Sequence, residues 1–261
     1  MLTTAAEVRE ACRTGRLTGP TPGLAPGFVQ ANLVVLPKDW AYDFLLFCQR
    51  NPKPCPLLDV TEVGSWEPTT AAPGADLRSD LPAYRIWING ELIAESTDVR
   101  NEWRDDLVSF LVGCSFTFEA ALLERGIPVR HIEQNRNVPM YRTNRPCKPA
   151  GRFGGPLVVS MRPMRPEQAI EATQICSRFS LAHGAPVHLG DPAALGIGEI
   201  SKPDYGEAVD FRPGEIPVFW ACGVTPQAAI LQAKPPFAIT HKPGHMFLTD
   251  LRDYQMASGP A

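Results

Sequence analysis

Two segments of the chain repeat the same spacing of reactive side chains. Residues 114–124 and 222–232 are identical at five of eleven positions. The matched reactive residues are Cys114, Thr117 and Glu119 in the first segment and Cys222, Thr225 and Gln227 in the second. A thiol and a hydroxyl beside the free N–H groups of a helix start can bind an anion or move a proton. We therefore take the two Cys-x-x-Thr turns as a candidate site.

The flanking sequence predicts how each turn is held. Apolar runs at 107–112 and 216–221 come before the turns and Ala/Leu-rich stretches follow them, which predicts a buried segment, a tight turn and a helix. For residues 105–124, two short helices that meet at the turn are a further interpretation. Pro226 predicts Thr225 as the helix N-cap, with the N–H groups from Gly223 onward directed toward Cys222. Two such turns that face each other would form an anion-binding pocket.

Histidines supply the other candidates for proton transfer. His188 and Asp191 follow an expected strand, although Asp191 before Pro192 is also typical of a plain helix start. His241 and His245 flank a Pro-Gly turn, where one of them can act as a general acid or base. Because no third and fourth ligand stand at fixed spacing, we expect no metal and no other cofactor.

Polar residues near two expected strands are candidates for substrate binding. Arg142 has the planar fork that grips a carboxylate, and Tyr141 and Asn144 stand beside it. A solvated surface turn is the alternative interpretation of this run. Asn32 is a weaker candidate, because amides that enter a strand often only satisfy the backbone.

The order of strand-like and helix-like segments predicts an α/β fold. We expect a three-layer sandwich of strand-helix-strand units in residues 1–75 and 151–261, with a smaller two-layer α+β module inserted at 76–150. Residues 84–94 predict a hairpin through an Asn-Gly turn. A second weak echo, between 33–59 and 157–191, suggests an internal duplication, with chance similarity as the alternative. Duplicated halves that exchange segments would explain the repeated turns better.

Composition narrows the class of protein. The 261 residues are 44% hydrophobic with a net charge of −3 and without a run of Lys and Arg, so we expect neither nucleic acid nor membrane as a partner. Seven cysteines without a C-x-x-C pair fit reduced thiols in the cytoplasm. The expected partner is a small acidic molecule, and a homodimer is left open.

Seven motifs lie at 29–37, 47–56, 113–116, 138–144, 188–192, 220–227 and 243–247. Together they resemble one family, the bacterial hydro-lyases related to mitochondrial D-glutamate cyclase. The likeness runs through residues 19–253. The resemblance implies a two-module α/β fold and a dehydration that closes D-glutamate to 5-oxo-D-proline. The mitochondrial relative carries a further C-terminal region that this chain lacks.

That reaction suggests roles for the candidate residues. Arg142 and Asn144 would hold the α-carboxylate, and the helix start at 223–225 would stabilise the oxyanion. His245 or His188 would move protons. The two thiols also resemble those of cofactor-independent amino-acid racemases, so a racemase is an alternative. A protein that binds a small acid without turnover is another.

Overall fold

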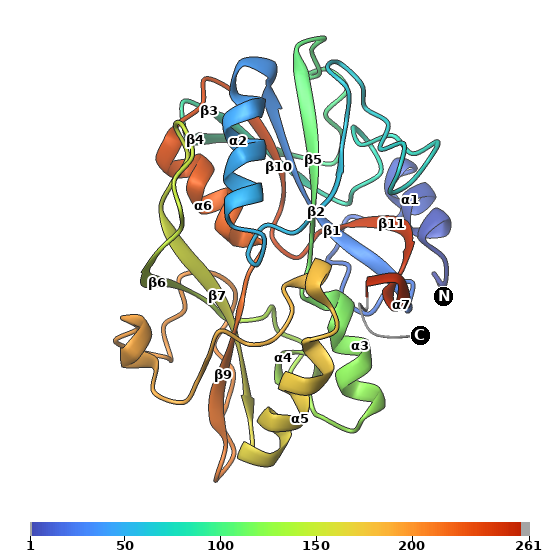
Figure 1. The fold of residues 1–261 in the computed structure, drawn as a ribbon. Coiled ribbons are helices and arrows are strands. Elements are labelled where there is room, and N and C mark those ends of the chain that lie inside the picture. Colours follow the sequence, from blue (N-terminus) through green and yellow to red (C-terminus); the bar gives the residue numbers. More distant parts are fainter. Residues whose placement is uncertain (1, 257–261) are drawn as a thin grey trace.

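The computed structural model describes residues 2–256, in which two β-sheets lie one above the other in the view of Figure 1. The helices are α1 (Ala5–Arg13), α2 (Lys38–Arg50), α3 (Phe116–Glu124), α4 (Arg130–Glu133), α5 (Pro166–Cys176), α6 (Val224–Ala233) and α7 (Asp253–Met256), with 3₁₀ turns η1 (Ser180–Ala182) and η2 (Pro192–Leu195). The strands are β1 (Phe28–Pro37), β2 (Leu57–Val60), β3 (Tyr84–Ile88), β4 (Glu91–Ser96), β5 (Leu107–Gly113), β6 (Met140–Pro146), β7 (Pro156–Met164), β8 (His188–Leu189), β9 (Ile216–Ala221), β10 (Ala238–His241) and β11 (Phe247–Arg252).

Neighbouring strands are antiparallel in both sheets. The first has the order β2-β5-β1-β10-β3-β4, with β11 on β1, and the second has the order β6-β7-β9-β8. The α/β class is confirmed, and the expected strand-helix-strand order is present as β1-α2-β2, but its two strands are not neighbours in the sheet. Strand β5 separates β1 from β2, and β9 separates β7 from β8. Both intervening strands come from far along the chain, and the pattern within one strand does not encode its neighbours.

The helices that follow the two turns exchange places between the sheets. Helix α3 follows β5 of the first sheet, but its Phe118 packs in one core with Trp220 of the second sheet. Helix α6 follows β9 of the second sheet, but its Ile230 packs with Val34 of the first. Figure 1 shows α3 beside α5 in the lower half and α6 in the upper half. This exchange interlocks the sheets and brings the starts of both helices to their junction.

The hairpin and the central strand decide two further expectations. The hairpin β3–β4 is confirmed, with positive φ at Asn89 (51°) and Gly90 (82°) as its two-residue turn requires. The two short helices considered for residues 105–124 are half wrong, because β5 is a buried strand. Residues 76–150, predicted as an inserted module, contribute β3, β4 and β5 to the first sheet and β6 to the second.

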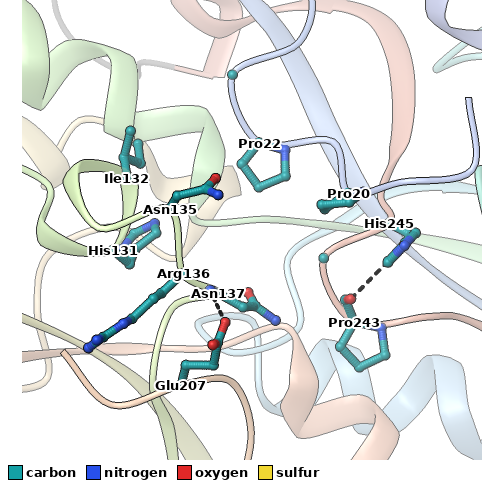
Figure 2. Close-up of a pocket in the computed structure, with 12 residues that line it drawn as sticks. Pro20, Pro22, His131, Ile132, Asn135, Arg136, Asn137, Glu207, Pro243 and His245 are labelled. Carbon is teal, nitrogen blue, oxygen red and sulfur yellow. Dashed lines mark hydrogen bonds between the residues drawn. The ribbon is translucent and has the colours of Figure 1, made fainter.

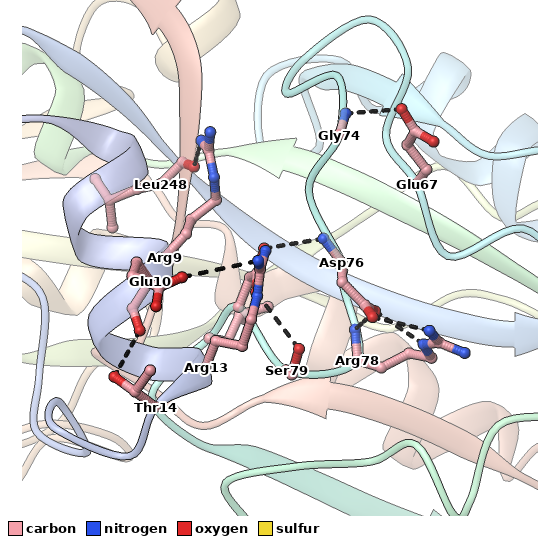
Figure 3. A network of polar contacts seen from close by, with 12 residues as sticks. Arg9, Glu10, Arg13, Thr14, Glu67, Gly74, Asp76, Arg78, Ser79 and Leu248 are labelled. Atoms are coloured by element: carbon pink, nitrogen blue, oxygen red, sulfur yellow. Dashed lines mark hydrogen bonds and ion pairs between the residues drawn. The ribbon is translucent and has the colours of Figure 1, made fainter.

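Arginines fasten α1 to the first sheet. Arg9 donates to the carbonyl of Leu248 (2.8 Å) and pairs with Asp250 (2.9 Å) on β11. Arg13 pairs with the buried Asp80 (2.7 Å), in the loop before β3. Figure 3 shows Arg9 and Arg13 on α1. Strand β11 starts near the junction of the sheets and runs away from it. These contacts therefore hold the chain segment that borders the candidate site.

Candidate functional site

The two Cys-x-x-Thr turns line one narrow pocket at the junction of the sheets. Cys114 comes directly after β5 and Cys222 directly after β9. The remaining lining residues are Asn32, Ser115, Phe116, Asn137, Val138, Met140, Gly223, Val224, His241, Pro243, Gly244 and Met246. The volume is about 20 Å³, which is room for roughly one water molecule. The pocket, which we call the floor of the site, is therefore too small to hold an amino acid by itself.

Asn32 bridges the two turns across this floor. Its Nδ2 donates to the carbonyls of Val112 (3.1 Å) and Gly113 (3.0 Å), at the end of β5. From the other side, a Cβ atom at residue 223 would lie only 2.1 Å from the same Nδ2. Gly223 is therefore needed for the close approach of Asn32 to the second turn.

Both thiols are protonated at neutral pH. Burial raises the pKa of Cys114 to about 12 and that of Cys222 to about 11. In each turn the N–H two residues further on, of Phe116 or Val224, donates to the sulfur and acts in the opposite direction, as does the charge of Arg162. The turns thus share one hydrogen-bonding pattern, in which a helix-start N–H faces a sulfur.

The two threonines differ from each other and from the prediction. The N-cap of α6 is Gly223, so the expected cap at Thr225 is wrong. Because Thr225 lies inside the helix, its hydroxyl instead reaches β7, where it accepts from Val158 N–H (3.0 Å) and donates to Val158 O (3.2 Å). The hydroxyl of Thr117 is buried and has no hydrogen-bond partner within residues 2–256.

An open pocket of about 460 Å³ lies against the floor and shares Asn137, Pro243 and Gly244 with it. Its other lining residues are Pro20, Pro22, Gly23, His131, Ile132, Asn135, Arg136, Glu207 and His245 (Figure 2). This volume is in the ordinary range for a small-molecule site. Burial lowers the pKa of His245, although its Nδ1 lies 3.0 Å from the carbonyl of Pro243. His245 is therefore neutral at neutral pH and can accept a proton.

A buried charge network supports the first turn. Arg162 on β7 donates to Glu119 on α3 through Nε (3.0 Å) and also contacts it through Nη2, while further bonds reach Ser115 (3.1 Å) and Ser160 (3.0 Å). His131 Nε2 lies 3.2 Å from the same oxygen of Glu119. Burial raises the pKa of Glu119, but the charge that His131 carries when its ring is protonated and the charge of Arg162 outweigh burial and lower the pKa to about 2.

The corresponding position in the second turn carries no charge. Gln227 donates from Nε2 to the carbonyl of His241 (3.3 Å) and lies against its ring. The ring itself accepts the N–H of Leu33 at Nδ1 (3.1 Å). Burial lowers the pKa of His241 to about 4, so this ring is neutral.

The structure places the predicted carboxylate-binding run away from the two turns. Alternation along β6 buries Tyr141, whose hydroxyl donates to Ile200 O (2.6 Å), and turns Arg142 outward. Both residues line another pocket of about 230 Å³ near Asp204. Asn144 packs against Gly196 close by. These three residues are grouped together, but they do not line the pocket of the two cysteines.

His188 and Asp191 also lie apart from the turns, at the edge of the second sheet. His188 Nε2 is 2.7 Å from the carbonyl of Asp191. The carboxylate of Asp191 accepts from Ala193 N–H and caps η2, which is the helix-start interpretation. The structure therefore brings together Cys114, Cys222, Gly223 and Asn32 at the floor and His245 at the open pocket.

Sequence reasoning missed the residues that connect these parts. Asn137 borders both pockets, and its backbone N–H is held by Glu207 (3.0 Å). Glu119 was visible as a matched position of the repeat, but no motif indicated Arg162 or His131 as its partners. Only the three-dimensional contact between β7 and the start of α3 reveals that a fully buried arginine, Arg162, lies beside the first turn.

Metal-ligand clusters and membrane-spanning helices are both absent from the part of the chain that the structure describes. Within residues 2–256, no group of three or more His, Cys, Asp or Glu side chains is arranged to hold a metal ion. In the same residues, no helix has the length and apolar character to cross a membrane.

Comparison with known proteins gives the family. The family model for D-glutamate cyclase matches residues 108–250, which include both turns, His131, Arg162 and His245. The chain belongs to this family. It is 62% identical to a protein of Stutzerimonas stutzeri named "Putative hydro-lyase", over 96% of this chain and 95% of that one. It is 65% identical to a protein of the same name from Streptomyces avermitilis, over 91% and 86%.

A solved structure is similar over most of the chain at low identity. The nitrogen repressor-like protein of Methanococcus jannaschii covers 94% of this chain and 98% of its own length at 10% identity. Its TM-score of 0.38 is too low to carry an argument about fold or function.

Proposed function

We propose that the protein is a lyase of the hydro-lyase type that cyclises D-glutamate, or a closely related small acid, with loss of water. The observation that carries the proposal is the meeting of the Cys114 and Cys222 turns at the floor of an open pocket that also contains His245. The resemblance to D-glutamate cyclase supports the reaction class. The substrate lies in the open pocket, since the floor is too small for it.

Cyclisation joins the amine nitrogen to the side-chain carboxyl carbon. The ammonium group must lose two protons in all, and the carboxyl oxygen that departs carries both away as water. His245, neutral because of its burial, accepts a proton from the ammonium group. The helix start at Gly223 faces the negative oxygen that develops on the carboxyl carbon, where the N–H of Gly223 and the positive end of α6 stabilise it.

The α-carboxylate needs a separate grip. Because Arg142 and Asn144 line another part of the molecule, we assign this contact to the side-chain amides of Asn135 and Asn137 in the open pocket. Arg136 is less suited, since its Nη1 is held by the carbonyl of Ala208 (2.7 Å). Holding both ends of the substrate folds the amine onto the side-chain carboxyl, which contributes much of the rate enhancement of such a step.

The test is turnover by the purified protein. D-glutamate, L-glutamate and a panel of small amino and hydroxy acids are incubated with it, and loss of water is read by mass spectrometry. We expect loss from D-glutamate, and a fall of about ten-fold or more in Gly223→Ala, whose methyl group displaces Asn32. Gly198→Ala, at a position with open space for the methyl group, is the matched control. No water loss from any compound would reject the proposal.

Two thiols from opposite turns in one pocket favour a racemase as the second candidate. In that reaction one thiolate removes the α-proton and the other thiol delivers a proton to the opposite face. The raised pKa values of Cys114 and Cys222 oppose it, because one thiol must first ionise. Deuterium uptake at the α-carbon from heavy water, abolished in Cys222→Ser, would decide for the racemase. Saturable binding with neither reaction would indicate a binding protein.

A further inference from the structure

His131 stands out among the buried polar groups of the site. Its side chain is 3% exposed, and it forms part of the wall of the open pocket (Figure 2). Within residues 2–256, Nδ1 has no hydrogen-bond partner, and Nε2 has none of standard geometry although Glu119 lies 3.2 Å from it. A buried polar atom without a partner costs about 1–3 kcal/mol, so such an atom at a pocket wall calls for an explanation.

The surroundings of the ring distinguish its two nitrogens. Nε2 lies 3.2 Å from Glu119 Oε1, and Arg162 contacts the same oxygen. A carboxylate at this distance favours the tautomer with its proton on Nε2. Nδ1 is then left as a lone pair without a donor. Arg162 balances the charge of Glu119, so the carboxylate stays ionised beside the ring.

His241, which lies beside the matched residue Gln227 of the second turn, provides a comparison for His131. His241 packs on Gln227 as His131 packs on Glu119, but its Nδ1 already accepts the N–H of Leu33. The partner of His241 is a neutral amide, which would not stabilise a charged ring. Of these two histidines, only His131 has a nitrogen without a hydrogen-bond donor and a neighbouring carboxylate.

We infer that His131, in the wall of the open pocket, is a second proton acceptor of the site, oriented at Nε2 by Glu119 and without a partner at its buried Nδ1. The inference rests on the proposed function and extends it. The ammonium group gives one proton to Nδ1, and Glu119 stabilises the imidazolium ion that forms. The amine nitrogen then bonds to the carboxyl carbon and gives its second proton to His245 as the carbon–oxygen bond breaks. The protons on His131 Nδ1 and on His245 both pass to the departing oxygen, which leaves as water.

A measurement without turnover tests the tautomer. In the ¹⁵N spectrum of the free wild-type protein, the neutral ring of His131 is expected to carry its proton on Nε2 and none on Nδ1. The signals are assigned by their disappearance in His131→Gln. A proton on Nδ1 of the neutral ring would overturn the inference whether or not D-glutamate is converted.

Turnover gives the second test and separates the two proposals. His131→Gly is expected to lose water formation from D-glutamate by about 100-fold or more, with recovery on addition of imidazole. The control His183→Asn, at a buried histidine of positive φ outside the pocket, should keep wild-type turnover. Wild-type turnover in His131→Gly would overturn the role of His131 and leave the cyclase proposal intact. A wild-type protein that converts nothing would reject the cyclase proposal instead.

Discussion

The Cys114 turn and the Cys222 turn have the same backbone design but different chemistry behind it. Each follows a buried strand, directs an N–H to its own cysteine sulfur and starts a helix without a side-chain cap. The first turn rests on the buried ion pair of Arg162 and Glu119. The second rests on Gln227 and on backbone bonds made by Thr225.

The difference shows how one pocket can contain unlike halves. A buried ion pair is costly to desolvate and contributes little net stability, but removal of one partner is severe. Neutral contacts such as those of Gln227 and Thr225 are weaker individually and tolerate replacement better. We infer that the first turn carries the proton chemistry and the second mainly fixes geometry.

The largest expected effect comes from breaking the ion pair of the first turn. Arg162→Met leaves Glu119 buried without its cation and should lower the free energy of unfolding by about 3–5 kcal/mol, measured by urea denaturation. Gln227→Met, in the second turn, should cost only about 1 kcal/mol.

A double variant shows whether charge is the cause. Adding Glu119→Gln to Arg162→Met removes both charges and should recover part of the lost stability. If Arg162→Met unfolds within 1 kcal/mol of the wild type, the claim that the first turn rests on buried charge is wrong.

A smaller effect separates the two turns by pH. The pKa of Glu119 is about 2 in the fold against an ordinary 4.5, so its stabilisation is complete above pH 4.5 and is lost as pH falls toward 2. The pKa of His241 is about 4 against 6.5, so its loss occurs as pH falls from 6.5 toward 4. Each window should amount to about 3 kcal/mol.

Variants assign these windows. Urea denaturation curves measured at a series of pH values give the free energy of unfolding against pH. His241→Gln should reduce its fall between pH 6.5 and 4, and Glu119→Gln should reduce its fall between pH 4.5 and 2. Burial also lowers the pKa of His183 to about 4. Part of the loss of stability between pH 6.5 and 4 should therefore remain in His241→Gln. Identical pH profiles in Glu119→Gln and the wild type would show that the carboxylate is not held ionised by the fold.

Local patterns predicted local structure well. The Asn89-Gly90 turn, the buried strand before Cys222 and the helix after it could all be predicted, because turn chemistry and periodicity act over a few residues. The pairing of strands could not be predicted, since β5 reaches its place between β1 and β2 only through contacts distant in sequence. The duplication stays a prediction; the order β2-β5-β1 matches β8-β9-β7 and is consistent with it.

The site was predictable where the repeat marked it. The matched spacing of Cys114 and Cys222 indicated a shared pocket before any contact was known, and the exchange of α3 and α6 places both turns there. The partners of Glu119 were not predictable, because Arg162 and His131 come from β7 and α4 and carry no motif. The alternation of side chains along β6 directs Arg142 outward, and the sequence alone did not show which residues of this strand face the interior.

The smallest expected effect concerns the two threonines, which hold matched places in the repeat. Thr225→Val keeps the shape but leaves Val158 N–H without its partner, while Val158 O keeps the N–H of Cys222 (3.0 Å), so it should cost about 1–3 kcal/mol. Thr117→Val removes a buried hydroxyl that has no partner within residues 2–256, so it should be neutral or stabilise by up to about 1 kcal/mol. Valine has the same small helix-propensity cost at both positions, which therefore cancels in the comparison. Urea denaturation of the two variants gives the difference, and equal losses would mean that the hydroxyl of Thr117 has a partner in solution, such as a bound water.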